Sequence, residues 1–511
     1  MSYGVDTFFG VPLLFHYHSD CDSMYNSSSI NYSFYIASQI TRPSTLTFET
    51  ISAGKSLQFQ QTFHLGKSYT SQFEMTANEA GKYEEMYSLA YSCKNYVFGT
   101  NLFFQGNPTV SVITFFAGLT FNQSFAMYPV CKDDISCTSS SRTEYHYYVL
   151  FGPVYYGREK TALLNGITIQ MHQKTEITIQ LSGAAHALNN TVEEPINRQF
   201  SIKDQGNTYT TLWIEPKVST CDKISPRSLE GTTVVSNKPI TVFTNQARCN
   251  GTVKFSYESQ VVHQVPEVND WGKLFIIDTQ QINMLPKSMR TNVKYELSIR
   301  AAQNGTTINI TYYQFNQLSQ TATDVLMTSN VYRVAHSVSS MLDTNHIAIS
   351  GSSPILVLYT IYSLHSNVHY SVLLQPVEWF SNKQTIALQH PTNNEVHRYH
   401  ISVVVPKEHY NPMDIQITEG KDLCQSIPVL NYKGFLSSTA ESYGYVVFYM
   451  ELKITGGTDN VTQLLLWHRN PHVHIGATVF AYAGDLQYAY SNGYTLSKLT
   501  LGLRHNQEHL A

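Results

Sequence analysis

A proline followed by a short apolar strand recurs along this chain, and this repeat constrains the fold more than any other feature. The copies read Pro-Thr-Val-Ser-Val-Ile-Thr-Phe-Phe, Pro-Ile-Thr-Val-Phe-Thr and Pro-Ile-Leu-Val-Leu-Tyr-Thr, and they begin at Pro108, Pro239 and Pro354. A second proline follows the first after 21, 27 and 22 residues, respectively. Because proline lacks an N–H group, it is tolerated at the start of a strand but not in the middle of a sheet. A unit repeated in this way predicts tandem domains of one fold.

Pairs of segments in which apolar and polar residues alternate precede each copy. They are residues 45–51 and 57–63, 166–171 and 175–181, and 295–300 and 306–312. Such alternation is typical of half-buried strands, so we expect each pair to form a β-hairpin. Asn304-Gly305, inside the last pair, favours a type I′ turn in which both residues have a positive φ.

These patterns predict an all-β protein built of tandem antiparallel β-sandwich-like repeat units. Helical periodicity is confined to residues 78–89. The alternative is a β-propeller-like assembly. Propeller blades span about 40–50 residues, however, and the unit here is roughly two to three times longer.

Four units are expected from the positions of the repeats. Their boundaries are 1–150, 151–285, 286–395 and 396–511. The first three carry the strands led by Pro108, Pro239 and Pro354, and the second also contains Trp271-Gly272. The fourth is expected to be a diverged copy with a Tyr-rich end, because it lacks the proline-led strand.

Composition excludes some classes of function. Of 511 residues, 42% are hydrophobic but only 14% are charged, and the net charge is −4. The chain therefore lacks the clustered Lys and Arg with which nucleic-acid-binding proteins contact phosphates. No apolar run reaches the roughly 18 residues that a membrane-spanning helix needs.

The seven cysteines form no Cys-x-x-Cys pair, which argues against a zinc ribbon or a thioredoxin-type site. Six of them are candidate disulfide partners: Cys131 with Cys137, Cys221 with Cys249, and Cys21 with Cys93. Cys424 would then be left over. The alternative is a set of reduced, buried thiols.

Eight asparagines begin an Asn-x-Ser/Thr sequon without proline, and these permit N-glycosylation. They are Asn26, Asn31, Asn122, Asn189, Asn250, Asn304, Asn309 and Asn460. The chain opens Met-Ser-Tyr-Gly-Val-Asp, without the basic segment of a secretory leader. We nevertheless expect an extracellular protein, and a fragment or a misassigned start would reconcile the two observations.

Signatures of hydrolytic enzymes are absent, since the chain has no Gly-x-Ser-x-Gly and no His-Glu-x-x-His. We therefore expect no catalytic residues and no cofactor. His468, His472 and His474 are the candidate metal ligands, because closely spaced imidazoles can share a zinc ion. Their simpler interpretation is a solvated strand edge, and a secreted metal-dependent hydrolase is the least favoured function.

Tyrosines gather at two places: Tyr145, Tyr147, Tyr148, Tyr155 and Tyr156, and Tyr482, Tyr488, Tyr490 and Tyr494. Exposed tyrosines would give a ligand a large and stiff contact area. Tyrosines packed across neighbouring strands would belong to the core. We favour the core interpretation; exposed aromatic rings lining one groove would instead indicate a lectin-like carbohydrate-binding module.

The segment Leu-Glu-Gly-Thr-Thr-Val-Val-Ser-Asn-Lys-Pro-Ile-Thr-Val-Phe, residues 229–243, resembles the N-terminal domain of IgGFc-binding protein. So do Gln264-Val-Pro and Trp271-Gly-Lys-Leu-Phe, which follow it. That family repeats a Gly-Thr-x-x-x-Ser-x-x-Pro-x-x-Val-Phe strand and then a Pro-x-x-x-Trp-Gly-x-x-Phe segment. The resemblance extends over residues 30–495 and is closest in the middle copy.

The resemblance implies a secreted glycoprotein, which in the vertebrate form is associated with mucus. The von Willebrand type D domains of that form carry Gly-Asp-Pro-His, which this chain lacks, so their covalent assembly is not implied. No antibody-contact residues can be mapped, so antibody binding is not carried over. We expect a non-enzymatic protein that acts by contact with extracellular proteins or glycans in mucus, matrix or a secreted barrier.

Overall fold

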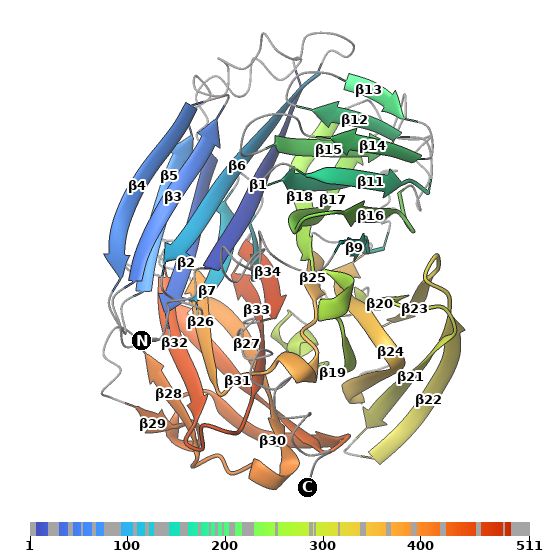
Figure 1. Cartoon of the computed structure of the whole chain (residues 1–511). Helices are drawn as coiled ribbons and strands as arrows, with labels where there is room; N and C mark the ends of the chain where they lie inside the picture. Colours follow the sequence, from blue (N-terminus) through green and yellow to red (C-terminus); the bar gives the residue numbers. More distant parts are fainter. Residues whose placement is uncertain are drawn as a thin grey trace, which may run out of the picture.

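The computed structural model of the chain consists almost wholly of antiparallel strands (Figure 1). It describes side chains within residues 143–491, apart from those in 154–164, 172–174, 183–213, 215–228, 247–260, 286–289, 291–292, 315–316, 337–345, 364–368, 385, 389–395, 420–425, 435–442, 455–461, 463 and 483–487. In these gaps and before residue 143, only the paths of the strands are described. The all-β prediction is confirmed.

The first eight strands form two four-stranded sheets, ordered β1-β6-β3-β4 and β5-β2-β7-β8. These strands, the first unit, are β1 (Thr7–His18), β2 (Ile30–Ser38), β3 (Ser44–Ser52), β4 (Lys55–Phe63), β5 (Ser68–Met75), β6 (Cys93–Gln105), β7 (Val110–Ala117) and β8 (Asn122–Ala126).

The next ten strands form the second unit, with sheets ordered β14-β11-β16-β9 and β13-β12-β15-β10-β17-β18. They are β9 (Tyr145–Tyr148), β10 (Ala162–Met171), β11 (Glu176–Gln180), β12 (Ala185–Asn189), β13 (Glu193–Ile196), β14 (Gln199–Lys203), β15 (Thr210–Pro216), β16 (Thr233–Ser236), β17 (Ile240–Asn250) and β18 (Lys254–Val265). The two sheets share one apolar core.

The third unit is built around the 20-residue strand β24. Its strands are β19 (Gly272–Asp278), β20 (Val293–Ala301), β21 (Thr306–Gln314), β22 (Gln317–Leu326), β23 (Val331–Ser337), β24 (Thr344–Ser363) and β25 (His369–Leu373). Residues 344–351 of β24 pair with β21, whereas residues 355–363 pair with β20. The β19 strand adjoins mainly the first half of β24, and β25 adjoins the second half. One long strand thus serves both sheets.

The fourth unit has sheets ordered β26-β32-β28-β29 and β30-β31-β27-β33-β34 around a common core. Its strands are β26 (Lys383–Gln389), β27 (Val396–Pro406), β28 (Ile415–Glu419), β29 (Ile427–Pro428), β30 (Phe435–Ser442), β31 (Tyr445–Thr455), β32 (Val461–His468), β33 (Gly476–Ala483) and β34 (Leu486–Ser491). The short 3-10 turns are η4 (Val268–Asp270), η5 (Gln280–Met284), η7 (Val377–Trp379), η8 (Lys407–His409) and η9 (Val429–Asn431).

All four units share one strand order. The strands β12, β13 and β30 are additions at sheet edges, and the two halves of β24 count as two strands. When the remaining strands of each unit are numbered one to eight along the chain, one sheet always has the order first–sixth–third–fourth. The other always runs fifth–second–seventh–eighth. The fourth unit follows this order too, so it is a full copy of the topology despite its divergent sequence.

The repeated proline marks the point where the chain crosses between the two sheets. Pro108, Pro239 and Pro354 lie between the sixth and seventh strands of their units. Pro471 lies at the same crossing in the fourth unit, between β32 and β33. At such a crossing the chain leaves one ladder before it enters the next, so a missing N–H is tolerated. Pro471 stands five residues before β33, so the fourth unit has a proline at this crossing but no strand that the proline leads directly.

Two of the three expected hairpins are instead crossings between sheets. β3 and β4 pair directly, as predicted. In contrast, β10 pairs with β15 and β17, and β20 pairs with β23 and β24, so neither pairs with the alternating strand that follows it. Alternation of apolar and polar residues indicates only that one face of a strand is buried. It does not distinguish a hairpin from a crossing between sheets. The type I′ prediction for Asn304-Gly305 is also wrong, because only Gly305 has a positive φ, of 76°.

We propose that the units span residues 7–126, 145–265, 272–373 and 383–491, which are the limits of their sheets. Each later unit then begins one strand earlier than the sequence-based boundaries place it. The reason is the aromatic segment after the second proline. Trp271 directly precedes β19, and Trp379 lies four residues before β26. Both tryptophans therefore lead into the first strand of the next unit and do not end the unit before it.

The units are arranged around a common centre, and Figure 1 shows them from blue through green and yellow to red. Their eighth strands close a ring of contacts: β8 with β18, β18 with β25, β25 with β34, and β34 with β8. Neighbouring units also share cores. Leu356 and Leu358 of β24 join the core of the second unit, and Phe480 of β33 joins that of the third. Each unit is a β-sandwich. The arrangement of the four units in a ring is the feature that this protein shares with a β-propeller.

Within the residues described, no helix is long and apolar enough to cross a membrane.

Candidate functional site

The second and third units meet through buried polar side chains. The apolar residues of β20 face the core of their own unit. Its polar residues Glu296, Ser298 and Arg300 alternate with them and are buried too, on the face toward the second unit. This strand therefore has one apolar face and one polar face, and both are covered. The alternating sequence puts the polar side chains on one face of β20, and the second unit covers that face and excludes solvent from it.

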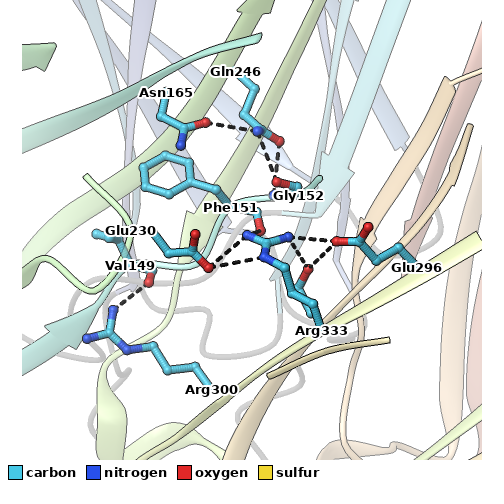
Figure 2. A network of polar contacts seen from close by, with 10 residues as sticks. Val149, Phe151, Gly152, Asn165, Glu230, Gln246, Glu296, Arg300 and Arg333 are labelled. Carbon is cyan, nitrogen blue, oxygen red and sulfur yellow. Dashed lines mark hydrogen bonds and ion pairs between the residues drawn. The ribbon is translucent and has the colours of Figure 1, made fainter. Parts of the chain in front are cut away.

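Arg300 is fully buried, with 0% exposure, and its guanidinium is held by backbone carbonyls. Nη1 donates to the carbonyl oxygens of Val149 at 2.5 Å and Thr232 at 3.0 Å, and Nη2 donates to that of Gly231 at 3.0 Å. Nε donates to the carbonyl of Thr328 at 3.1 Å. Three of these carbonyls belong to the second unit, so the Arg300 side chain connects two units. Figure 2 shows its contact with Val149.

The charge of Arg300 is maintained in this setting. Its guanidinium carbon lies 4.9 Å from the centre of the Tyr148 ring, a cation–π contact. Burial lowers the pKa of Arg300 to about 10, and Tyr148 and Glu230 act in the opposite direction. The group is thus still protonated at neutral pH.

Arg333 on β23 completes the junction and brings two carboxylates to it (Figure 2). Its Nη1 lies 2.7 Å from Oε1 of Glu296 and 2.7 Å from the Ser298 hydroxyl. Its Nη2 lies 3.0 Å from Oε1 of Glu230 and donates to the Phe151 carbonyl at 3.0 Å. Arg333 therefore binds both carboxylates, whereas Arg300 is held by backbone carbonyls. Such a network specifies one relative placement of the units rather than adding much stability.

Gln246 fixes the loop that runs over this junction. Its side-chain amide accepts from the Gly152 N–H at 3.0 Å and donates to the Gly152 carbonyl at 3.2 Å. It also donates to Asn165 at 2.9 Å. A β-carbon at Gly152 would come within 2.7 Å of the Gln246 oxygen, so any larger residue there would displace this amide.

A buried His–Asp pair joins the third and fourth units. Nε2 of His400 lies 2.6 Å from Oδ2 of Asp278, and the His400 ring stacks on Tyr449 with 4.8 Å between ring centres. The other carboxylate oxygen of Asp278 accepts from the Gln280 N–H at 2.8 Å. Among the described side chains, Nδ1 of His400 has no hydrogen-bond partner.

A third polar contact lies where the eighth strands meet. Nε2 of His263 on β18 is 3.0 Å from the hydroxyl of Ser371 on β25, which is itself 3.0 Å from the Thr360 hydroxyl. Burial lowers the pKa of His263 to about 3, and the neighbouring His369 adds to this effect. His263 is therefore neutral over the physiological range.

The three candidate metal ligands lie around the connection from β32 to β33 rather than together on one strand. The imidazole of His468 is already engaged: Nδ1 accepts from the Asn470 N–H at 3.1 Å, and Nε2 lies 3.1 Å from the His409 carbonyl. His472 is exposed in the turn, and His474 is half-buried. No group of three potential metal ligands occurs in the part of the chain whose side chains are described.

The described tyrosines of the two clusters belong mainly to the core. Tyr145, Tyr147, Tyr488 and Tyr490 are at most 7% exposed, which agrees with the core interpretation. The Tyr490 hydroxyl donates to the carbonyl of Ala387 at 2.7 Å. Tyr148 and Tyr482 are half-buried. Tyr155, Tyr156 and Tyr494 lie outside the described residues.

The predicted disulfides and most sequons concern side chains that are not described. Cys93 and Cys249 lie on β6 and β17, where only the strand path is described, and the other cysteines fall in the gaps. Asn31, Asn122, Asn189 and Asn250 likewise lie on described strand paths, and Asn26 and Asn460 fall in gaps. Asn304 is exposed and Asn309 is half-buried.

This architecture defines a class of protein: an all-β scaffold of repeated sandwiches locked together by buried polar contacts. The sequence model of one protein family, described as IgGFc binding protein, matches residues 137–463. The chain belongs to this family of binding proteins, and the resemblance noted in the sequence is confirmed. No curated protein matches the chain.

The family signature is part of the junction. Gly231 and Thr232, the Gly-Thr of the signature, supply two of the carbonyls that bind Arg300, and Glu230 before them binds Arg333. Gly231 has a φ of 86°, which favours glycine. Trp271, from the second signature segment, is 4% exposed and packs edge-on against Tyr148. The signature thus specifies how two units dock.

Sequence reasoning missed Arg300 and Arg333. Both stand at polar positions of alternating strands, where a side chain normally faces solvent. The available signal was composition: only 14% of the chain is charged, yet the strand β20 alone contains Lys294, Glu296 and Arg300.

Proposed function

We propose that this protein is an extracellular, glycosylated, non-enzymatic binding protein that acts by contact with proteins or glycans in mucus, matrix or a secreted barrier. The observation that carries the proposal is the family match over residues 137–463. The junctions support it, because Arg300, Arg333 and the Asp278–His400 pair are all used to join units. A chain in which only 14% of the residues are charged is suited to binding by shape and hydrogen bonding.

The extracellular part of the proposal is supported by the two sequons whose side chains are described. Asn304 is exposed and Asn309 is half-buried on one face of β21, so both could carry a glycan without opening the core. The disulfides Cys131–Cys137, Cys221–Cys249 and Cys21–Cys93 belong to the same proposal.

We favour proteins over glycans as the binding partners for one reason. A lectin-like groove needs exposed aromatic rings, whereas the described tyrosines of both clusters are at least half-buried. The family description names the Fc part of IgG. We limit the partners to extracellular proteins in general, because Thr232 and Trp271 of the signature are buried and cannot reach a ligand.

Peptide mass mapping of the native protein, with and without reductant and N-glycosidase, tests the proposal. We expect cross-linked Cys131–Cys137 and Cys221–Cys249 peptides and a mass shift of the sequon peptides after deglycosylation. Binding to arrays of extracellular proteins and glycans, with a heat-unfolded sample as control, would then identify the ligand class. Free thiols together with eight bare sequons would contradict the extracellular assignment.

A further inference from the structure

The β22 strand is an open sheet edge. Among the described strands, β22 pairs only with β21, and every residue from 317 to 325 is exposed except the half-buried Ala322. Leu318 is 63% exposed and Val325 is 59% exposed. An edge of this kind offers unpaired backbone N–H and C=O groups to any other strand.

The usual protections of an edge strand are nearly absent here. Natural proteins shorten their edges or place Lys and Pro on them. Of the equivalent strands, β14 and β29 are short, at 5 and 2 residues, whereas β4 has 9 residues and begins with Lys55. The β22 strand has 10 residues, with Asp324 as its one charge and no proline. Something outside the strand itself must protect this edge.

Two sequon asparagines lie beside this strand. Asn309 on β21 is paired with Thr323 of β22, and its Oδ1 accepts from the Thr323 hydroxyl at 2.8 Å. Asn304 precedes β21, and its Oδ1 accepts from both the N–H and the hydroxyl of Thr328, at 2.8 and 3.0 Å, just past the end of β22. Because an N–H can only donate, the oxygen of Asn304 must face Thr328.

These contacts leave the amide nitrogens available. Nδ2 is the atom that carries an N-linked glycan, and in neither Asn304 nor Asn309 does it form a hydrogen bond within the described structure. A glycan on Asn309 would extend over the outer face of the β21–β22 pair, and one on Asn304 would lie at the end of β22. Each is bulky and strongly hydrated.

We propose that glycans on Asn304 and Asn309 protect the β22 edge from pairing with β22 of a second copy of the chain. This inference rests on the extracellular, glycosylated nature proposed above. It assigns these two sequons a role in keeping the protein monomeric.

A second copy fits this edge because β22 complements itself. In an antiparallel two-fold pairing centred between Thr321 and Ala322, each Leu318 lies opposite Val325. Each Asp324 then lies opposite Ser319 rather than opposite the other Asp324. Apolar side chains meet across the strands and like charges stay apart, which are the conditions for stable pairing.

The first test is glycopeptide mapping of Asn304 and Asn309 in the native protein. We expect both to be occupied. If both were bare while other sequons were occupied, the edge protection would be overturned and the extracellular assignment would stand. If all eight sequons were bare, both proposals would fail.

The second test is the solution mass of the Asn304→Gln/Asn309→Gln variant by sedimentation equilibrium. We expect a shift from the monomer mass to twice that mass, while Asn189→Gln, which removes the sequon on β12, stays monomeric. Adding Val325→Lys should restore the monomer. Val396→Lys is the matched control, because Val396 is 56% exposed but lies on β27, and it should leave the dimer intact.

Trimming the wild-type protein to one sugar per site with an endoglycosidase covers the case in which the double variant does not fold. The trimmed protein should dimerise as well. A trimmed or doubly substituted protein that stays monomeric, or a dimer that Val325→Lys and Val396→Lys affect equally, would overturn the inference.

Discussion

At the scale of single residues, Arg300 supports the junction between the second and third units. The variant Arg300→Met would remove the guanidinium donor from the four carbonyls that it binds and a nearby positive charge from Glu230. We expect a loss of about 3–5 kcal/mol in the free energy of unfolding. Urea denaturation of the whole chain measures this.

The matched control for this change is Lys294→Met on the same strand. Lys294 is half-buried and takes no part in the junction, so its replacement should change the free energy of unfolding by less than about 0.5 kcal/mol. Equal losses from the two variants would show that the junction contacts of Arg300 do not contribute.

His263 makes stability depend on pH. The native pKa is about 3, while the unfolded chain has the ordinary value of 6.5. Between these values the unfolded state binds a proton that the native state does not, so stability is lost as the pH falls from 6.5 toward 3. The loss is at most about 1.4 kcal/mol per pH unit.

Urea unfolding of wild type and His263→Gln between pH 7 and pH 4 measures this contribution. The variant should lose less stability on acidification, since glutamine can hydrogen bond to Ser371 without titrating. His472→Gln, at an exposed position, should follow the wild type. The explanation is wrong if His263→Gln loses stability as steeply as wild type.

At the scale of elements, glycine allows the links between units to pack. Gly272 stands at the start of β19, where the second unit connects to the third. Its backbone packs against Pro376, in the segment that connects the third unit to the fourth: a β-carbon at Gly272 would come 2.1 Å from Cβ of Pro376. We expect Gly272→Ala to cost about 1–3 kcal/mol, because atoms on both links must move.

Gly305→Ala is the comparison for this prediction. Nothing lies within 4 Å of a β-carbon at Gly305, so only its positive φ of 76° opposes the change, at roughly 1 kcal/mol. Thermal unfolding ranks the two variants. A smaller effect at Gly272 than at Gly305 would mean that the two links are not closely packed.

The sequence predicted the strands better than their connections. Alternation in residues 295–300 and 306–312 located β20 and β21 correctly, because one buried face produces that pattern in any sandwich. It could not distinguish a hairpin from a crossing, since both need only a turn. A turn with two positive φ values occurs instead at Tyr443-Gly444, where the bulky Tyr443 gives no sequence signal for it.

The sequence analysis missed the junction residues for a related reason. Arg300 occupies a position that would face water if the third unit stood alone, and only docking against the second unit buries it. The signature segment that was recognised contributes the other half of this contact through Gly231 and Thr232. The alternation of apolar and polar residues therefore reveals the strands of a unit. Whether the polar face of such a strand is buried depends on a neighbouring unit that is distant in sequence.

At the scale of the whole molecule, shared cores should make the units unfold together. Phe480 of the fourth unit packs edge-on against Tyr359 and Tyr370 of the third, with ring centres 6.4 and 6.3 Å apart. We expect Phe480→Ala to cost about 3–5 kcal/mol and to speed hydrogen exchange in β24 and β25. Val479→Ala is the control, because the adjacent Val479 faces the core of its own unit and should affect exchange mainly there. If Phe480→Ala left exchange in β24 and β25 unchanged, the third unit would be independent of the fourth, and the ring would be an array of separate domains.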